Sequence, residues 1–326
     1  DCIKRLLLVV VSICYSISSH GQISISEHDY TIFFKNKEVE LVFENPVSLI
    51  AQAITTNEVL KVIPQKGIGN SYVIENVAAA TIIKLDYHNI GGKNTSTKTT
   101  YLATPSLSTG AMTVYFNHAV STVYAQTQNA VNLGNTLDDQ LISYINACST
   151  SLDIAIYNSY SPSAATGIAG AINAAYTRGV QVRVIYDGST SSVMIPLLNS
   201  AIPVLASPTS SSYGIMHNKF VVFDAASTDA TKPLVWTGST NWTTAQIDGP
   251  DKNSALAIQD QSLALGYKIE FEEMWGSATA TPDLNNSKFG QYKADNTPHN
   301  FVIGGSVVEC YFSPSDGTNS KIIAAV

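Results

Sequence analysis

The sequence predicts an α/β domain preceded by a small all-β sandwich. Short β-branched and aromatic runs separated by turn residues fill the chain from residue 23 to about 105, whereas strand patterns alternate with helical patterns from about residue 111. The chain has 326 residues, of which 45% are hydrophobic and 13% charged. This length fits about two domains, and this composition supports ordinary hydrophobic cores and excludes a disordered chain.

Residues 1–22 have the pattern of an export signal. Lys4 and Arg5 precede an apolar run over residues 6–17, and small and polar residues follow as far as Gln22. The run is shorter than a membrane-spanning helix requires. We therefore expect a signal peptide over residues 1–22 and a protein that is secreted or resides in the cell envelope. A buried first strand is the alternative.

Residues 23–105 are expected to form a β-sandwich that acts as an accessory domain. Turn residues, for example at 67–70 and 91–94, separate six short runs rich in β-branched and aromatic residues. These runs cover residues 30–34, 39–43, 59–63, 71–74, 81–87 and 99–103. Their spacing predicts a small sandwich. It is similar to fibronectin type III or immunoglobulin-like modules, and it contains no set of residues suited to catalysis.

From residue 111 to 278 the pattern predicts the α/β domain. Gly179 ends an alanine-rich helix, and Thr136 stands where a helix N-cap is expected. The expected strands cover residues 112–116, 151–157, 180–186, 202–205, 217–223, 235–237 and 254–258. The expected helices cover residues 137–145, 164–177, 192–199 and 261–275.

One stretch of this domain carries specific chemistry. It has the form H-x-K-x-x-x-x-D and consists of His217, Lys219 and Asp224; a G-S-x-N stretch with Ser239 and Asn241 follows. Residues two apart in a strand point to the same face, so His217 and Lys219 are expected to face one pocket. Ser239 and Asn241 are expected to project together from the neighbouring strand. Either stretch alone is more typical of a solvated face or a loop, but the combination favours a functional site.

These residue types suit the cleavage of a phosphodiester. The negative charge of the diester repels a nucleophile, and cationic and hydrogen-bonding groups must hold the charge that builds on the phosphoryl oxygens. Imidazole can attack phosphorus and leave again, because its ordinary pKa is near neutrality. The motif therefore predicts phosphoryl chemistry at a histidine.

The paired motif resembles that of the phospholipase D superfamily, often called the HKD motif, and the similarity covers roughly residues 111–276. Asn241-Trp242-Thr243 and the aromatic and acidic helix end at 271–275 also stand where similar families place such residues. The resemblance implies a mixed sheet flanked by helices. It also implies an active site in which two motifs meet: one histidine becomes a phosphohistidine, and the other protonates the leaving oxygen and then activates water.

The same resemblance assigns roles to the site residues. His217, Lys219 and Asp224 are expected to be catalytic, with His217 either the nucleophile or the acid–base partner. Lys219 and Asn241 are expected to hold phosphate oxygens. Ser239 is expected to assist them, and Asp224 to order the strand end.

The chain departs from the family pattern in two ways. Relatives often carry a glutamate that orients the histidine, but Asn253 stands there and Asp251 slightly earlier, so orientation of His217 by a carboxylate is in doubt. The chain also contains one H-x-K motif, so the other half of the site is expected from a second repeat in the same chain or from a homodimer partner.

The C-terminal residues are expected to begin such a second repeat. Residues 307–326 echo the strand at 112–116 and the helix at 137–145. We therefore expect a linker over residues 279–306, a truncated second repeat from 307, and a chain that is a fragment of a two-repeat protein. A chance strand–helix similarity is the alternative.

The cysteine and histidine pattern and the net charge indicate which cofactor and which class of substrate to expect. No C-x-x-C pair or His/Cys cluster indicates a metal, so we expect a metal-free active site without cofactors, and Cys148 and Cys310 as free thiols. The net charge of −7 disfavours tight binding of nucleic acid. We therefore favour a phospholipase D-type phosphodiesterase that acts on phospholipid or another phosphodiester. The alternatives are a secreted nuclease of the same superfamily and an inactive cell-surface binding module.

Overall fold

The computed structural model describes residues 23–90, 96–123, 125 and 129–326. The signal peptide expected over residues 1–22 lies outside the described residues. Among the helices that are described, none has the length and apolarity needed to cross a bilayer. Neither Cys148 nor Cys310 takes part in a disulfide bond within the described residues.

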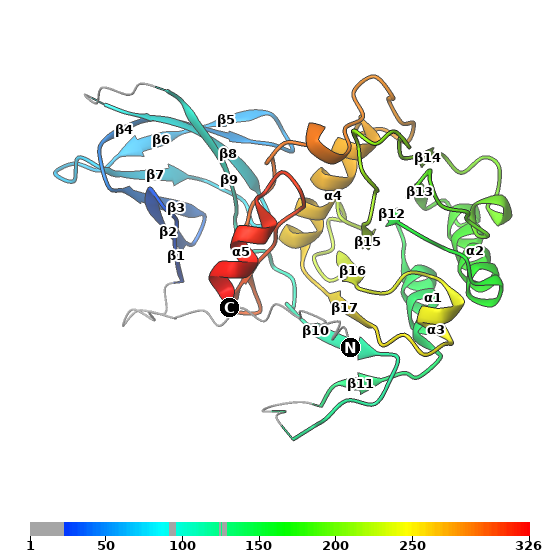
Figure 1. The fold of residues 1–326 in the computed structure, drawn as a ribbon. Coiled ribbons are helices and arrows are strands. Elements are labelled where there is room, and N and C mark those ends of the chain that lie inside the picture. Colours follow the sequence, from blue (N-terminus) through cyan, green and yellow to red (C-terminus); the bar gives the residue numbers. More distant parts are fainter. Residues whose placement is uncertain (1–22, 91–95, 124, 126–128) are drawn as a thin grey trace. The chain divides into compact units, whose positions relative to one another are not determined.

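The chain divides into two compact units (Figure 1). The first, here called the sandwich unit, joins the residues up to 105 to residues 294–326. The second, here called the α/β unit, spans residues 106–293. Each unit has a hydrophobic core of its own.

The sandwich unit contains two antiparallel sheets that share one core. Leu41 and Ile74 of the first sheet and Ile83 and Leu85 of the second are completely buried there. The sheets have the strand orders β1-β2-β3-β7-β6 and β5-β4-β8-β9. Their strands are β1 (Ser24–Ser26), β2 (Tyr30–Lys35), β3 (Glu38–Phe43), β4 (Val47–Ala53), β5 (Glu58–Leu60), β6 (Val62–Pro64), β7 (Ser71–Glu75), β8 (Ile82–Asn89) and β9 (Lys98–Ala103). The expected all-β sandwich is confirmed, and its likeness to fibronectin or immunoglobulin modules stays a prediction.

Two regions of the sandwich differ from the sequence-based expectation. The pattern does not predict β4, because its inward-facing Ala51 and Ala53 give a weak hydrophobic signal while Ile50 is exposed. The single strand expected over residues 59–63 is interrupted at Lys61 and supplies β5 and β6, which belong to different sheets. One apolar run therefore forms two strands, because the chain crosses between the sheets at that point.

Residues 294–326 add a hairpin and a short helix to the sandwich unit. β18 (Asn300–Ile303) pairs with β19 (Ser306–Glu309), and α5 (Thr318–Ala325) follows. Val302 lies in the sandwich core, and the Asn300 side chain donates a hydrogen bond of 2.6 Å to Glu27. β18 thus lies within residues 279–306, the range expected as a linker, and packs into the sandwich core. That a second repeat begins at residue 307 stays a prediction.

The α/β unit is built on an eight-stranded mixed sheet of order β11-β10-β17-β16-β15-β12-β13-β14. β12, β13 and β14 are parallel to one another, whereas β12 and β15, β15 and β16, and β16 and β17 pair antiparallel. The strands are β10 (Met112–Phe116), β11 (Val131–Asn132), β12 (Ser151–Ile156), β13 (Gln181–Tyr186), β14 (Val204–Ala206), β15 (Lys219–Phe223), β16 (Leu234–Gly238) and β17 (Ser254–Ile258). The expected mixed sheet is confirmed.

Helices cover both faces of this sheet (Figure 1). α1 (Leu137–Ala147) and α2 (Pro162–Thr177) pack together over one face. α4 (Gln261–Trp275) covers the other face, where its Phe271 lies 4.9 Å from the Arg183 guanidinium and its Tyr267 contacts Phe220. Successive strand residues point to opposite faces, so Val184 and Val221, the neighbours of Arg183 and Phe220, lie in the core beneath α1 and α2.

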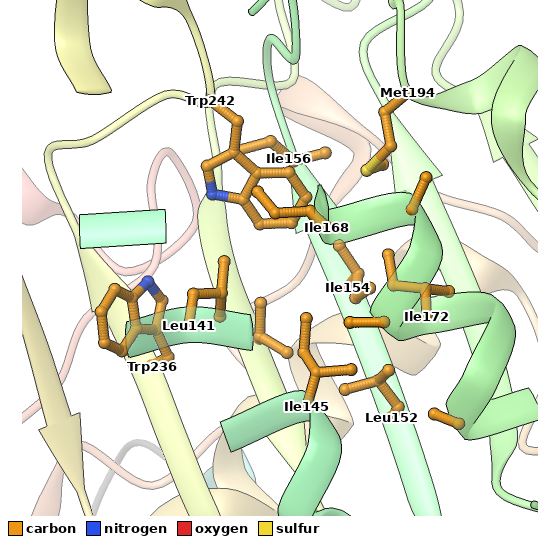
Figure 2. Close-up of a cluster of buried hydrophobic side chains, with 14 of the residues drawn as sticks. Leu141, Ile145, Leu152, Ile154, Ile156, Ile168, Ile172, Met194, Trp236 and Trp242 are labelled. Carbon is orange, nitrogen blue, oxygen red and sulfur yellow. The ribbon is translucent and has the colours of Figure 1, made fainter. Parts of the chain in front are cut away.

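The core between the sheet and the first helical layer holds the α/β unit together (Figure 2). Burying each large aliphatic side chain stabilises the fold by about 1.5–3 kcal/mol. The side chains that meet there include Leu141, Ile145, Leu152, Ile154, Ile156, Ile168, Ile172, Met194, Trp236 and Trp242. The strand ends that carry polar residues are thereby fixed to a rigid support.

Local differences from the predicted helices have simple causes. The helix expected over residues 192–199 is only the 3-10 turn η1 (Ile195–Leu197), since Pro196 lacks the N–H that a longer helix would use. Thr136 occupies the N-cap position of α1, but its hydroxyl donates to the Leu133 carbonyl oxygen at 2.9 Å instead of accepting a helix N–H. The sequence pattern also does not predict the short helix α3 (Thr244–Ile247).

Candidate active site

The predicted site residues lie at one edge of the α/β sheet. Ile156 at the end of β12 is opposite Lys219 at the start of β15, and Phe220 is opposite Thr237 of β16. Because these strands are antiparallel, the end of β12, the start of β15 and the end of β16 meet at the same edge. The residues brought to this edge are His217, Lys219, Ser239 and Asn241.

The ring of Tyr157 contacts both His217 and Lys219. It meets the imidazole edge-on, with ring centroids 4.6 Å apart, and Lys219 Nζ lies 5.1 Å from its centroid. Lys219 Nζ also donates a hydrogen bond of 2.9 Å to the His217 carbonyl oxygen. The two motif side chains therefore lie against one aromatic ring, on the same side of the strand end, as the two-residue spacing predicts.

The environment lowers the pKa of both cationic side chains. Burial and the charge of Lys219 lower the pKa of His217 below its ordinary 6.5, against the opposing effect of Asp187. Burial lowers the pKa of Lys219 to about 8. At neutral pH His217 is therefore mainly neutral, with a lone pair available, whereas Lys219 is mainly charged and attracts an anion.

Asp187 anchors the segment that leads into His217. This residue is 1% exposed, and its Oδ2 accepts hydrogen bonds from the Met216 N–H at 2.7 Å and the Ser207 hydroxyl at 3.3 Å. Its Oδ1 accepts the Ser189 N–H at 2.9 Å. Since Met216 directly precedes His217, the buried carboxylate fixes the backbone from which the imidazole projects.

Ser239 is held by the following strand. Its hydroxyl donates to Asn253 Oδ1 at 3.0 Å and accepts the Ser254 N–H at 3.1 Å. Gly238 makes this approach possible, because a Cβ at that position would lie 2.2 Å from the Ser254 carbonyl oxygen. Asn253 therefore positions Ser239, and the carboxylate that acts electrostatically on His217 is Asp187.

Two buried amide oxygens at this edge have no hydrogen-bond partner within the described residues. They are Oδ1 of Asn158 and Oδ1 of Asn241. The Trp242 N–H donates to the Asn158 carbonyl oxygen at 2.9 Å, so the two segments are adjacent. Rotation of an amide exchanges its oxygen and its NH2 group, so Asn241 can present a donor to a phosphate oxygen.

The α/β unit matches known proteins over this site. The family model described as "Cardiolipin synthase, PLD-like domain" matches residues 141–275, a range that includes every site residue described above. The chain contains a phospholipase D-like domain. This domain carries the mixed sheet, the helices on both of its faces and the His217 edge.

Relatives of the phospholipase D-like domain include mitochondrial cardiolipin hydrolases. That of Drosophila melanogaster is 28% identical over 159 residues, which are 44% of this chain and 60% of that protein. That of Canis lupus familiaris is 27% identical over 185 residues, which are 55% of this chain and 65% of that protein. The match therefore covers less than two thirds of the length of either relative.

Solved structures similar to this chain include two bacterial proteins. The phospholipase D family member Nuc from Salmonella typhimurium has a TM-score of 0.39 and 22% identity, over 55% of this chain and 97% of that one. NucT from Helicobacter pylori has a TM-score of 0.33 and 25% identity, over 42% of this chain and 85% of that one.

Asp224 lies apart from the other motif residues in this domain. It follows β15 at the end opposite His217, roughly 16 Å from Lys219 along an extended strand. Its buried carboxylate accepts the N–H groups of Ser149, Thr150 and Ser151. Asp224 contacts the α1–β12 turn and is far from the His217 edge, a placement that fits the expected role in ordering a strand end; its catalytic assignment stays a prediction.

Sequence reasoning missed Tyr157, Asn158 and Asp187. Tyr157 ends the strand predicted over residues 151–157, and Asn158 and Asp187 directly follow predicted strands; polar residues at such ends are a usable signal for a site. Their relation to His217 depends on pairings between strands that are distant in sequence, since β12 lies between β13 and β15. The spacing of the motif alone carries no information on those pairings.

Proposed function

We propose that the phospholipase D-like domain hydrolyses phosphodiesters through a phosphohistidine. A nitrogen of neutral His217 attacks phosphorus, the bond to the leaving alcohol oxygen breaks, and an acid from a second half-site protonates that oxygen. Water then attacks the phosphohistidine, which releases the phosphomonoester and restores His217. Lys219, Asn241 and Ser239 hold the charge that develops on the phosphoryl oxygens.

The observation that carries this proposal is the pairing of His217 and Lys219 against Tyr157 at one sheet edge. A neutral imidazole has a lone pair to donate, and its remaining N–H is too weak an acid to protonate a leaving oxygen, so its lowered pKa favours His217 as the nucleophile over the acid. Lys219 supplies the positive charge that such an attack needs. Since His217 is assigned as the nucleophile, another group must act as the acid. This requirement supports a second half-site from another repeat or a homodimer partner.

We propose a phospholipid headgroup as the substrate. Two relatives carry the name mitochondrial cardiolipin hydrolase, and the matching family model is described as cardiolipin synthase. The net charge of −7 also disfavours the phosphate-neutralising contacts that nucleic acid binding requires. The N-terminal export pattern supports a protein that meets its lipid outside the cell or in the envelope.

The test offers the protein, with its second half-site present, three substrates side by side: cardiolipin vesicles, phosphatidylcholine vesicles and single-stranded DNA. We expect hydrolysis of the lipids, with release of phosphatidic acid or phosphatidylglycerol, and little cleavage of DNA. In His217→Ala this turnover should fall by several orders of magnitude, because covalent catalysis is lost. His88→Ala, which alters a histidine of the sandwich unit, is the matched control and should retain activity.

Three other outcomes would each contradict a part of the proposal. Near-normal hydrolysis by His217→Ala would rule out a phosphohistidine intermediate at His217. Rapid, salt-sensitive DNA degradation with inert vesicles would identify a nuclease instead. Vesicle binding without turnover by the wild-type protein would identify an inactive surface-binding module.

The second half-site is tested by the oligomeric state. Light scattering measures the mass of the active species, and the dependence of specific activity on protein concentration shows whether a dimer forms the site. An active monomer with one H-x-K motif would contradict the need for a second half.

A further inference from the structure

Three polar side chains converge next to the β18–β19 hairpin of the sandwich unit. His299 Nε2 lies 3.2 Å from Asp295 Oδ1 and 3.5 Å from Asp316 Oδ2. One ligand atom from each residue can be chosen so that all lie within 4.8 Å of one another. Asp295 and His299 precede β18, whereas Asp316 follows β19, so the group joins segments on both sides of the hairpin.

The spacing of these atoms fits a shared metal ion. Tetrahedral coordination with bonds of about 2.0 Å separates neighbouring ligand atoms by about 3.3 Å. The two distances from His299 Nε2 lie on either side of this value. A single strong hydrogen bond between an imidazolium and a carboxylate would be about 2.8 Å long.

His299 Nε2 is within ion-pair distance of both carboxylates, and a shared metal ion would require the same position. His299 Nε2 is buried from solvent, and it makes no hydrogen bond of acceptable geometry within the described residues, although it is close to two carboxylates. Ligand atoms of a metal point at the ion and not at one another. A nitrogen that is close to both carboxylates and aligned with neither satisfies this condition.

Two neighbouring oxygens are also buried without a partner in the described part of the chain. They are Asn296 Oδ1, beside Asp295, and Thr318 Oγ1, two residues after Asp316. Buried polar atoms without partners are rare, because desolvation costs about 1–3 kcal/mol for each. The two oxygens lie on the same two segments as the cluster.

Asp316 has the support that a metal-binding carboxylate requires. The residue is 5% exposed, its Oδ2 accepts the Phe312 N–H at 2.7 Å, and its Oδ1 accepts the Ser315 hydroxyl at 2.6 Å. Such outer contacts fix the direction of a ligand and strengthen metal binding. Asp295 is half exposed and leaves a path by which an ion can enter.

We propose that Asp295, His299 and Asp316 bind a first-row divalent metal ion such as Zn²⁺. One imidazole and two carboxylates suit this class better than Ca²⁺ or Mg²⁺, which prefer oxygen ligands alone. The ion would connect the segment before β18 to the turn before α5 and so stabilise the sandwich unit. This proposal is independent of the phosphodiesterase proposal, because the group lies outside the phospholipase D-like domain.

The test measures Zn²⁺ binding to the full chain after chelator treatment and dialysis. We expect about one tightly bound ion per chain by calorimetry, and a higher melting temperature when Zn²⁺ is added. His299→Gln and Asp295→Asn should each weaken binding at least about tenfold. Asp295→Asn also removes a 3.2 Å contact with His299 that exists without metal, so its readout is the rise in melting temperature on adding Zn²⁺, which should be smaller than that of the wild-type protein.

His28→Gln is the matched control. His28 also lies beside a carboxylate, 3.1 Å from Asp29, but its side chain is 95% exposed and no second carboxylate pairs with it among the described residues. This variant should bind Zn²⁺ as the wild-type protein does. The proposal fails if the wild-type chain binds no Zn²⁺ at stoichiometric concentration, or if His299→Gln and Asp295→Asn bind it as tightly as the wild type.

Discussion

Lys219 donates its hydrogen bond to the backbone carbonyl oxygen of His217, and in the described chain it forms no ion pair with a carboxylate. The carbonyl oxygen accepts the hydrogen bond without cancelling the charge of Lys219. The ammonium therefore stays available to a negatively charged ligand. Because it is also partly buried, its positive charge is costly until an anion is bound.

This arrangement predicts a bell-shaped dependence of kcat/KM on pH. Lys219 must be protonated to hold a phosphate, and its pKa of about 8 means that activity falls as pH rises above about 8. His217 must be neutral to attack, and its pKa below 6.5 places the acid limb below that value. Rates measured from pH 5 to 10 on a neutral-headgroup substrate test both limbs.

Lys219→Arg provides the control for the alkaline limb. A guanidinium stays charged throughout this range, so the variant should lose the fall above pH 8 even if its absolute rate is low. An unchanged alkaline limb in Lys219→Arg would show that another group titrates there.

Asp187→Asn is expected to weaken catalysis without removing a group that touches substrate. The asparagine can still accept the Met216 N–H, but the negative charge that raises the pKa of His217 is lost. We expect kcat to fall about 10- to 100-fold through misplacement of the imidazole, and the acid limb of the pH profile to move to lower pH. A loss of rate with an unshifted acid limb would limit Asp187 to a structural role.

Asp224→Asn tests whether Asp224 is catalytic or structural. Burial raises the pKa of Asp224, but hydrogen bonds from Thr150 and Ser151 outweigh it, so the pKa is lowered below 3.8. A lowered pKa stabilises the fold above the unfolded-state pKa, and the contribution is lost as pH falls. The variant should be less stable by about 2–4 kcal/mol at pH 7, with the difference shrinking in acid.

Activity provides the second measurement on Asp224→Asn. The residue has φ of 51°, a conformation that asparagine tolerates, so the backbone turn should persist. Per folded molecule, kcat should stay within a few-fold of the wild-type value. A loss of several orders of magnitude in folded protein would restore Asp224 to the catalytic group.

Local patterns predict those parts of the structure that depend on residues close together in the sequence. The two-residue spacing of His217 and Lys219 places them on one side of a strand end, and the helix expected over residues 261–275 has the observed bounds of α4. Asp187 could not be assigned in this way, because it reaches the His217 segment only through the pairing of β12 with both β13 and β15. The motif spacing also does not show that Asp224 lies at the strand end far from His217, because residues along an extended strand are separated in space.

The candidate metal ligands lie away from the His217 edge, so the proposed hydrolysis is expected to need no metal ion. The Asp187 carboxylate already accepts hydrogen bonds from the Met216 N–H and the Ser207 hydroxyl. Lys219 already supplies a positive charge at the site. In the described part of the chain, the His and carboxylate group with metal-ligand spacing is Asp295, His299 and Asp316. Phosphodiester hydrolysis should therefore survive excess EDTA at a temperature at which the stripped sandwich unit stays folded. Complete loss of hydrolysis in EDTA, with recovery on adding a divalent metal and no change in folding, would contradict catalysis by His217 and Lys219 alone.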